Sequence, residues 1–151
     1  MVRIAAVIVL AAMIAISAAA NAEPVDVLFQ QFGLFGVWAH DCQQPAAPTN
    51  PHVSITTPSP GLVLEDHNLG PNYTINHYRL VSAERLSAEQ VSVVVVFQPG
   101  AEAEERQKLV FLVRKGTRRT LFNQADGNEV RVRDGIVLAF GRKTPVLNKC
   151  E

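Results

Sequence analysis

Tight turns follow one another along the second half of this chain and constrain its fold more than any other feature. The turn sequences are Lys115-Gly116, Asp126-Gly127-Asn128 and Asp134-Gly135. Each supplies glycine or asparagine for the positive φ that hairpin turns need, so the strands that they join are antiparallel neighbours. Helical periodicity almost disappears after Gly33, and this half of the chain is therefore expected to form a β-meander.

Short strand-like runs, rich in apolar and β-branched residues, fill the chain between its turns. The runs cover residues 34–41, 52–57, 62–66, 73–81, 91–97, 108–114, 117–123, 129–133 and 136–140. Their spacing predicts an all-β fold, either a small barrel or a sandwich. The meander favours an antiparallel up-and-down barrel of about eight strands, because sandwiches usually need longer crossings between their sheets.

The N-terminus has the three parts of a cleavable secretory signal peptide. Arg3 gives a positive start, residues 4–20 form an apolar stretch, and Ala20-Asn21-Ala22 offers small residues to a signal peptidase. A retained membrane anchor is the alternative, but the stretch falls short of the span of about 20 apolar residues that a membrane helix needs. We therefore predict cleavage after Ala22. The predicted parts are a signal-peptide helix at 1–22, a helical segment at 23–33 and a single barrel domain at 34–151.

A short helix is predicted over residues 24–32. Pro24 suits a first helical turn, and Asp26 favours the positive end of the helix dipole. The apolar residues of one helical face are Val25, Leu28, Phe29 and Phe32. This face needs a partner to bury it.

Two runs, 93–97 and 109–113, are apolar at every position. A strand with one solvated face alternates polar and apolar residues, so both faces of these two strands are expected to be covered. We predict that the N-terminal helical segment packs on their outer face. A subunit interface is the alternative cover.

Two cysteines remain in the mature chain, Cys42 and Cys150. In an oxidising compartment an even pair without C-x-x-C spacing is typical of one structural disulfide. That bond would tie the end of the run 34–41 to the last residue but one. Two free thiols, or pairing between chains, are the alternatives.

Gly36-Val37-Trp38 resembles the G-x-W signature of lipocalins and of the wider calycin group of small antiparallel barrels. The surrounding stretch also resembles small exported bacterial proteins. The lipocalin resemblance implies that Gly36 and Trp38 are structural and that Trp38 plugs the closed end of the barrel, at the floor of any ligand site. It also implies a basic side chain stacked on the indole, for which Arg142 is the candidate.

Basic residues gather at the turn between the runs 108–114 and 117–123. Hairpin pairing would set Arg114 and Arg119 on the same side, near one rim. If that side faces the interior, they could hold the carboxylate of an amphiphile at the barrel mouth. A solvated basic hairpin tip is the alternative interpretation.

Several function classes lack support in the sequence. Removing the signal peptide takes Arg3 from 14 basic and 14 acidic side chains, which leaves 13 and 14 and a formal charge of −1. This balance gives no field for nucleic acid or an anionic membrane. None of the four histidines has metal-ligand spacing to another His or Cys, and there is no G-x-S-x-G motif. We therefore expect no cofactor and no metal.

The sequence favours an exported, non-enzymatic binding protein of the periplasm or the secreted fraction, whose mature form does not span a membrane. Its expected partner is a small apolar or amphipathic ligand held in the barrel. The alternative partner is an envelope protein, as for an envelope protease inhibitor. A small envelope enzyme is the third reading.

Overall fold

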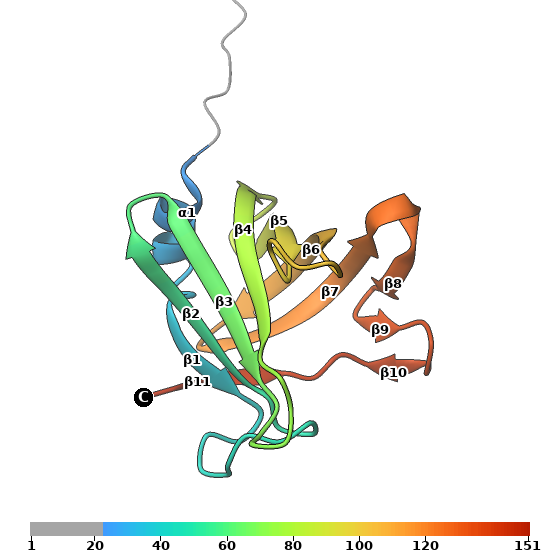
Figure 1. The fold of residues 1–151 in the computed structure, drawn as a ribbon. Coiled ribbons are helices and arrows are strands. Elements are labelled where there is room, and N and C mark those ends of the chain that lie inside the picture. The colour runs from blue at the N-terminus through green and yellow to red at the C-terminus, as the bar shows by residue number, and fades with distance from the viewer. Residues whose placement is uncertain (1–22) are drawn as a thin grey trace, which may run out of the picture.

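The computed structural model describes residues 23–151, and the predicted signal peptide, residues 1–22, lies outside the described residues. The described chain forms one short helix, α1 (Val25–Gln31), followed mainly by strands (Figure 1). The strands are β1 (Gly36–Ala39), β2 (His52–Ser59), β3 (Leu62–Asn68), β4 (Asn76–Arg85), β5 (Gln90–Phe97), β6 (Glu105–Arg114), β7 (Thr117–Ala125), β8 (Val130–Arg133), β9 (Ile136–Val137), β10 (Arg142–Lys143) and β11 (Leu147–Cys150), with a 3-10 turn, η1 (Asp126–Asn128), after β7. Within residues 23–151, no helix has the length and apolar character needed to cross a membrane.

Eight of these strands close into an antiparallel barrel. Their order around it is β1, β2, β3, β4, β5, β6, β7 and β11, and β11 pairs back to β1. Lys115 and Gly116 have positive φ angles of 46° and 75°, as the predicted hairpin turn between β6 and β7 requires. The predicted all-β antiparallel barrel with a short N-terminal helix is confirmed.

Strands β8, β9 and β10 form a small branch beside the barrel wall (Figure 1). β11 pairs with residues 117–118 at the start of β7, whereas β8 pairs with residues 123–124 near its end. The two strands therefore share one edge of β7. The predicted runs 129–133 and 136–140 belong to this branch, and the eighth barrel strand is β11, which the sequence pattern did not predict.

The first and last strands of the barrel meet along the β1–β11 ladder. Val37 lies opposite Cys150 in this ladder, and Cys42 follows β1 closely. The disulfide between Cys42 and Cys150 is present as predicted, with 5.5 Å between the two Cα atoms. One bond within the chain therefore clamps the two strands that complete the barrel.

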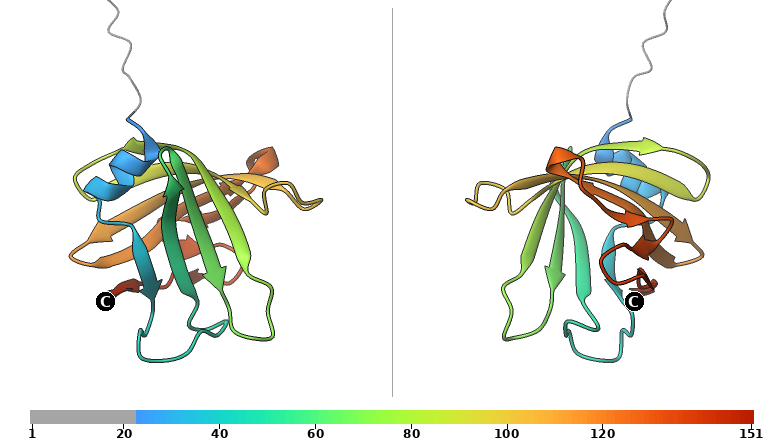
Figure 2. Two further views of the ribbon diagram at one scale, coloured as in Figure 1. Left: turned by 60° about the vertical axis from the view of Figure 1, so that its left-hand side comes forward. Right: turned by 90° about the vertical axis from the view of Figure 1, so that its right-hand side faces the viewer.

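Helix α1 lies across one end of the barrel, beside the turn that joins β2 to β3 (Figure 2). Leu28 and Phe29 are fully buried and share a core cluster with Ile55, Val63 and Val93. The prediction that this segment packs on the outer face of β5 and β6 is therefore wrong. An open barrel end exposes core side chains, so covering that end removes more apolar surface from water.

The outer face of β5 is covered in part by long side chains of its neighbours. Val96 is only 6% exposed, and its cross-strand partners are Arg79 on β4 and Arg106 on β6. Aliphatic stems of arginine shield apolar neighbours in this way while their charged heads stay in water. On β6, Val110 lies opposite Phe122 of β7. Ladder neighbours therefore explain the lack of alternation without a partner subunit.

Candidate functional site

A pocket of about 180 Å³ opens inside the barrel, among residues nearer the end opposite α1. Its polar lining consists of Glu65, His67, Tyr78, Gln107, Arg118, Thr120 and Asn123, and its apolar lining of Val95, Leu109, Phe111 and Val132. These residues come from β3 to β8. The pocket is therefore a polar chamber in a barrel whose other half is packed with apolar side chains.

A larger hollow, of about 500 Å³, lies beside α1, β4 and β5. Of its four charged members, Glu84, Arg85 and Lys108 are exposed and Glu23 is half-buried, so solvent reaches them. Buried polar groups with fixed partners are what give a site its specificity. We therefore take the inner pocket as the candidate functional site.

The floor of the pocket is a buried ion pair between Glu65 on β3 and Arg118 on β7. The guanidinium donates to both carboxylate oxygens, at 2.7 Å and 3.1 Å, and the two side chains are 6% and 4% exposed. Burial raises the pKa of the Glu65 carboxyl. The charge of Arg118 and the hydrogen bonds from His67 and Arg118 outweigh burial and hold that pKa well below its ordinary range. The pair is therefore fixed and internally neutral.

Aromatic rings support the cation of this pair. The Arg118 guanidinium lies 4.6 Å from the centre of the Phe111 ring and 6.0 Å from that of Trp38. Such contacts stabilise a cation that has lost water. They also leave the guanidinium little freedom to turn toward a ligand.

His67 is held by the same carboxylate. Its Nε2 lies 2.7 Å from Oε1 of Glu65. Because a carboxylate only accepts, Nε2 carries the hydrogen, and in the neutral ring Nδ1 is an acceptor. The imidazole packs against the Tyr78 ring, with 4.8 Å between centroids.

Tyr78 lies directly opposite Glu65 in the β3–β4 ladder. Burial raises the pKa of its phenol, and the charges of Glu65 and Glu105 add to this effect. Arg131 opposes it, and the pKa is raised to about 12. The phenol therefore stays protonated at neutral pH.

A chain of side-chain hydrogen bonds runs down one wall of the pocket. At the mouth, Arg131 donates to both carboxylate oxygens of Glu105 at 2.8 Å. Gln107 Nε2 donates to the same carboxylate at 2.7 Å, and Asn123 Nδ2 donates to Gln107 Oε1 at 3.0 Å. Asn123 Oδ1 is the one buried side-chain polar atom, within residues 23–151, that lacks a hydrogen-bond partner. Such an atom needs an explanation.

A β-bulge turns Asn123 into the pocket. The ladder pairs Phe111 with Thr120 but Val110 with Phe122, so one extra residue is inserted in β7. Thr120 before the bulge and Asn123 after it then both line the interior. Without the bulge, residues 120 and 123 would point to opposite faces.

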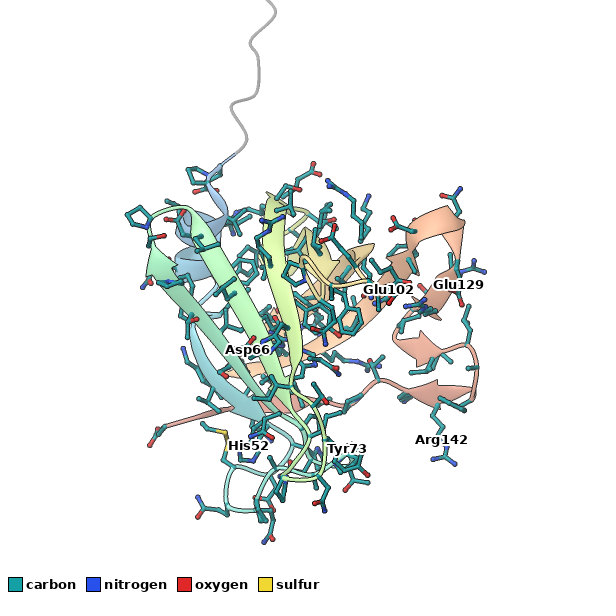
Figure 3. The ribbon with its side chains drawn as sticks, viewed as in Figure 1. His52, Asp66, Tyr73, Glu102, Glu129 and Arg142 are labelled. Atoms are coloured by element: carbon teal, nitrogen blue, oxygen red, sulfur yellow. A yellow bond between two sulfur atoms is a disulfide. The ribbon has the colours of Figure 1, made fainter. Side chains whose placement is uncertain are left out.

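Trp38 is buried within the barrel core, and its Nε1 donates to the Leu34 carbonyl at 2.8 Å. The cations over its ring are Lys149, at 5.7 Å, and Arg118. Arg142, the candidate for this stacking, instead projects from β10 away from the barrel (Figure 3). The candidate was therefore wrong, because β10 lies in the branch and the last barrel strand is β11.

Arg114 and Arg119 lie on the same face of the β6–β7 hairpin, as hairpin pairing predicted, but this face is the outer one. Arg114 is exposed and pairs with Glu89 at 2.6 Å. Arg119 donates to the carbonyl of Gly135 at 2.8 Å and so connects β7 to the branch of β8, β9 and β10. Neither lines the pocket. The inward-facing arginine of this hairpin is Arg118, one position along from the prediction.

No group of three or more side chains suited to a metal occurs within residues 23–151. The fold and the pocket together define a class: a small closed antiparallel barrel with a polar internal site. Comparisons of this chain with family models, with curated proteins and with solved structures found no match. Its function is therefore argued from the site itself.

Proposed function

We propose that this protein is an exported, non-enzymatic binding protein that holds a small polar molecule inside its barrel. The observation that carries the proposal is the pocket wall: Asn123 offers a buried acceptor without a partner, fixed by Gln107 and Glu105. A few fixed polar groups in a concave site are typical of ligand recognition.

The size of the pocket favours a small ligand. Its 180 Å³ equals the share of about six water molecules in the liquid. Drug-sized ligands occupy about 300 to 1,000 Å³. The polar lining and this volume support a compact polar molecule rather than the apolar or amphipathic ligand expected from the sequence.

The protonation states of Glu65 and Tyr78 favour a binding role for these two groups over acid–base catalysis. A general acid or base works best when its pKa lies near the working pH. The pKa of Glu65 lies well below that range, and the pKa of Tyr78, about 12, lies above it. Neither group is therefore suited to exchange a proton at neutral pH.

Export is part of the same proposal. The Cys42–Cys150 disulfide suits an oxidising compartment, such as the periplasm or the secreted fraction, and the predicted signal peptide leads there. The Gly36-Val37-Trp38 motif, with Trp38 buried inside the barrel, supports a lipocalin-like relationship.

Mass spectrometry of protein from the exported fraction tests the proposal. We expect a mass that begins at Glu23, two hydrogens light, and a small molecule that is present in the native spectrum and lost on denaturation. Val132→Phe, which fills the pocket, should lose the molecule, whereas Val146→Phe on the exposed surface should keep it. A ligand-free wild-type protein would contradict the proposal.

A second candidate, a protein-interaction module such as an envelope protease inhibitor, is favoured by the branch. Leu138 and Phe140 on the branch, after β9, are 47% and 75% exposed. Large exposed apolar side chains are typical of contact surfaces. Wild-type protein should then inhibit an envelope protease, and Phe140→Ser should not. Equal inhibition by both would remove the branch from this role.

A further inference from the structure

We infer that the pocket selects a ligand that donates a hydrogen bond through an N–H or O–H group and carries no negative charge. This inference names the ligand class of the site and rests on the proposed function. It is carried by the direction of the hydrogen bonds along the pocket wall and by the pairing of the buried charges.

The direction of the hydrogen bonds is set at the mouth. The Glu105 carboxylate accepts from Arg131, so the nitrogen of the Gln107 amide must face Glu105. The Gln107 oxygen then faces Asn123 and accepts from its nitrogen. A flipped Asn123 would set two acceptors against each other. Its Oδ1 is therefore fixed as an acceptor, and a ligand must bring the hydrogen.

Other groups in the pocket agree with this polarity. His67 gives its Nε2 hydrogen to Glu65, which leaves Nδ1 as an acceptor in the neutral ring. The amide hydrogen of Gln107 that faces Glu105 is already used. The site therefore has spare acceptors among its lining residues, beside the Tyr78 and Thr120 hydroxyls, which can donate as well as accept.

The buried charges disfavour an anion. Arg118 is the buried arginine of the pocket, and both of its terminal nitrogens already donate to Glu65. An anion would have to share Arg118 with the Glu65 carboxylate, which already neutralises it, or lie against Asn123 Oδ1. An uncharged or cationic donor avoids both costs.

Four probes of nearly equal shape separate the possibilities: acetamide, acetamidinium, acetone and acetate. Acetamide and acetamidinium have N–H donors, whereas acetone and acetate have only acceptors. Titrations of the full mature chain are followed by nitrogen–proton NMR at the side-chain amides of Asn123 and Gln107. We expect both donors to bind at least about tenfold more tightly than acetone or acetate, because an unmatched acceptor leaves Asn123 Oδ1 unpaired.

Asn123→Leu keeps the shape of this side chain and removes the acceptor. When binding is followed at the side-chain amide of Gln107, this variant should bind acetamide no more tightly than acetone. The control variant Asn72→Leu, in an exposed loop, should bind both as the wild type does. Asn123→Asp keeps an acceptor and adds a negative charge, so it should strengthen acetamidinium binding even if the leucine variant does not fold.

The outcomes separate the two proposals. Acetate or acetone binding as tightly as acetamide overturns the ligand class and leaves the binding pocket in place. If Asn123→Leu still binds acetamide more tightly than acetone, the ligand class is also overturned and the binding pocket stays in place. If none of the four probes shifts any pocket signal, the proposed binding function fails together with the ligand class.

Discussion

Arg118 on β7 donates two hydrogen bonds to Glu65 on β3, across the inside of the barrel. Three strands, β11, β1 and β2, separate these two in the order of the sheet. The pair therefore connects distant parts of the wall that share no ladder. It stabilises the barrel only as a pair, because either charge alone would be buried without compensation.

Removing one partner should destabilise the protein strongly. We expect Arg118→Met to lower the free energy of unfolding by about 3 to 5 kcal/mol, because it leaves the Glu65 carboxylate buried with only His67 as a partner. The double variant Glu65→Leu/Arg118→Met should recover much of that loss. Arg114→Met, which breaks an exposed pair, should cost less than about 1 kcal/mol. Urea unfolding followed by the fluorescence of Trp38 measures all three, and equal effects of the two single variants would contradict the assignment.

The stabilisation by Glu65 should depend on pH. Its pKa in the folded chain lies below the unfolded value of about 4.3, so its contribution is complete above about pH 5 and falls as the pH drops below about 4. The difference in unfolding free energy between wild type and Glu65→Gln should therefore shrink as acid is added. A difference that stays constant from neutral pH to pH of about 3 would rule this out.

The phenol of Tyr78 should titrate at a higher pH than an ordinary tyrosine. With Tyr73→Phe as background, the ultraviolet absorbance of phenolate should rise with a pKa of about 12 in the folded protein. The unfolded value is about 10, so the hydroxyl contributes stability below that pH and the contribution disappears as the pH rises toward the folded pKa. Tyr78→Phe should remove this alkaline loss. A midpoint near the ordinary value would show that the phenol is not buried as the structure places it.

Helix α1 should be needed for a stable barrel. Phe29 is fully buried among core residues, and Phe29→Ala should cost about 3 to 5 kcal/mol of unfolding free energy. Val27 on the same helix is 44% exposed, so Val27→Ala should stay within about 0.5 kcal/mol of wild type. Thermal unfolding of both variants measures this, and a mild effect of Phe29→Ala would mean that the helix does not close the barrel.

The disulfide should stabilise mainly by restricting the unfolded chain. Cys42 and Cys150 are 108 residues apart, and a loop of that size contributes about 4 to 5 kcal/mol in the chain-entropy model. Cys42→Ser/Cys150→Ser should lose about that amount in urea unfolding. The reduced wild-type protein should have the same free energy of unfolding as the double variant. A loss of stability that occurs in the double variant but not in the reduced wild-type protein would be an effect of the two serines.

The general plan of the barrel follows from local signals in the chain. Hairpin turns such as Lys115-Gly116 predicted neighbouring antiparallel strands, and the two cysteines predicted the clamp between first and last strand. The last strand, β11, escaped prediction because Leu147–Cys150 has no apolar alternation. It pairs only because the closed sheet brings β1 and β7 to it.

The site was harder to predict than the fold. Arg118 and Arg119 are adjacent and identical in type, so only the strand register decides which one is inside. Asn123 faces the pocket because of a bulge in β7, and alternation counted along the sequence places it on the opposite face from Thr120. Both placements depend on side-chain direction, which is set by the ladder rather than by composition.

The clamp between Cys42 and Cys150 makes a covalent ring of nearly the whole barrel. Strands β2 to β10 all lie between its two cysteines. A protease that cuts once in any loop of that ring opens it without releasing a fragment, because both pieces remain joined through sulfur. The chain can thus be nicked and still keep every strand of its barrel wall beside its neighbours.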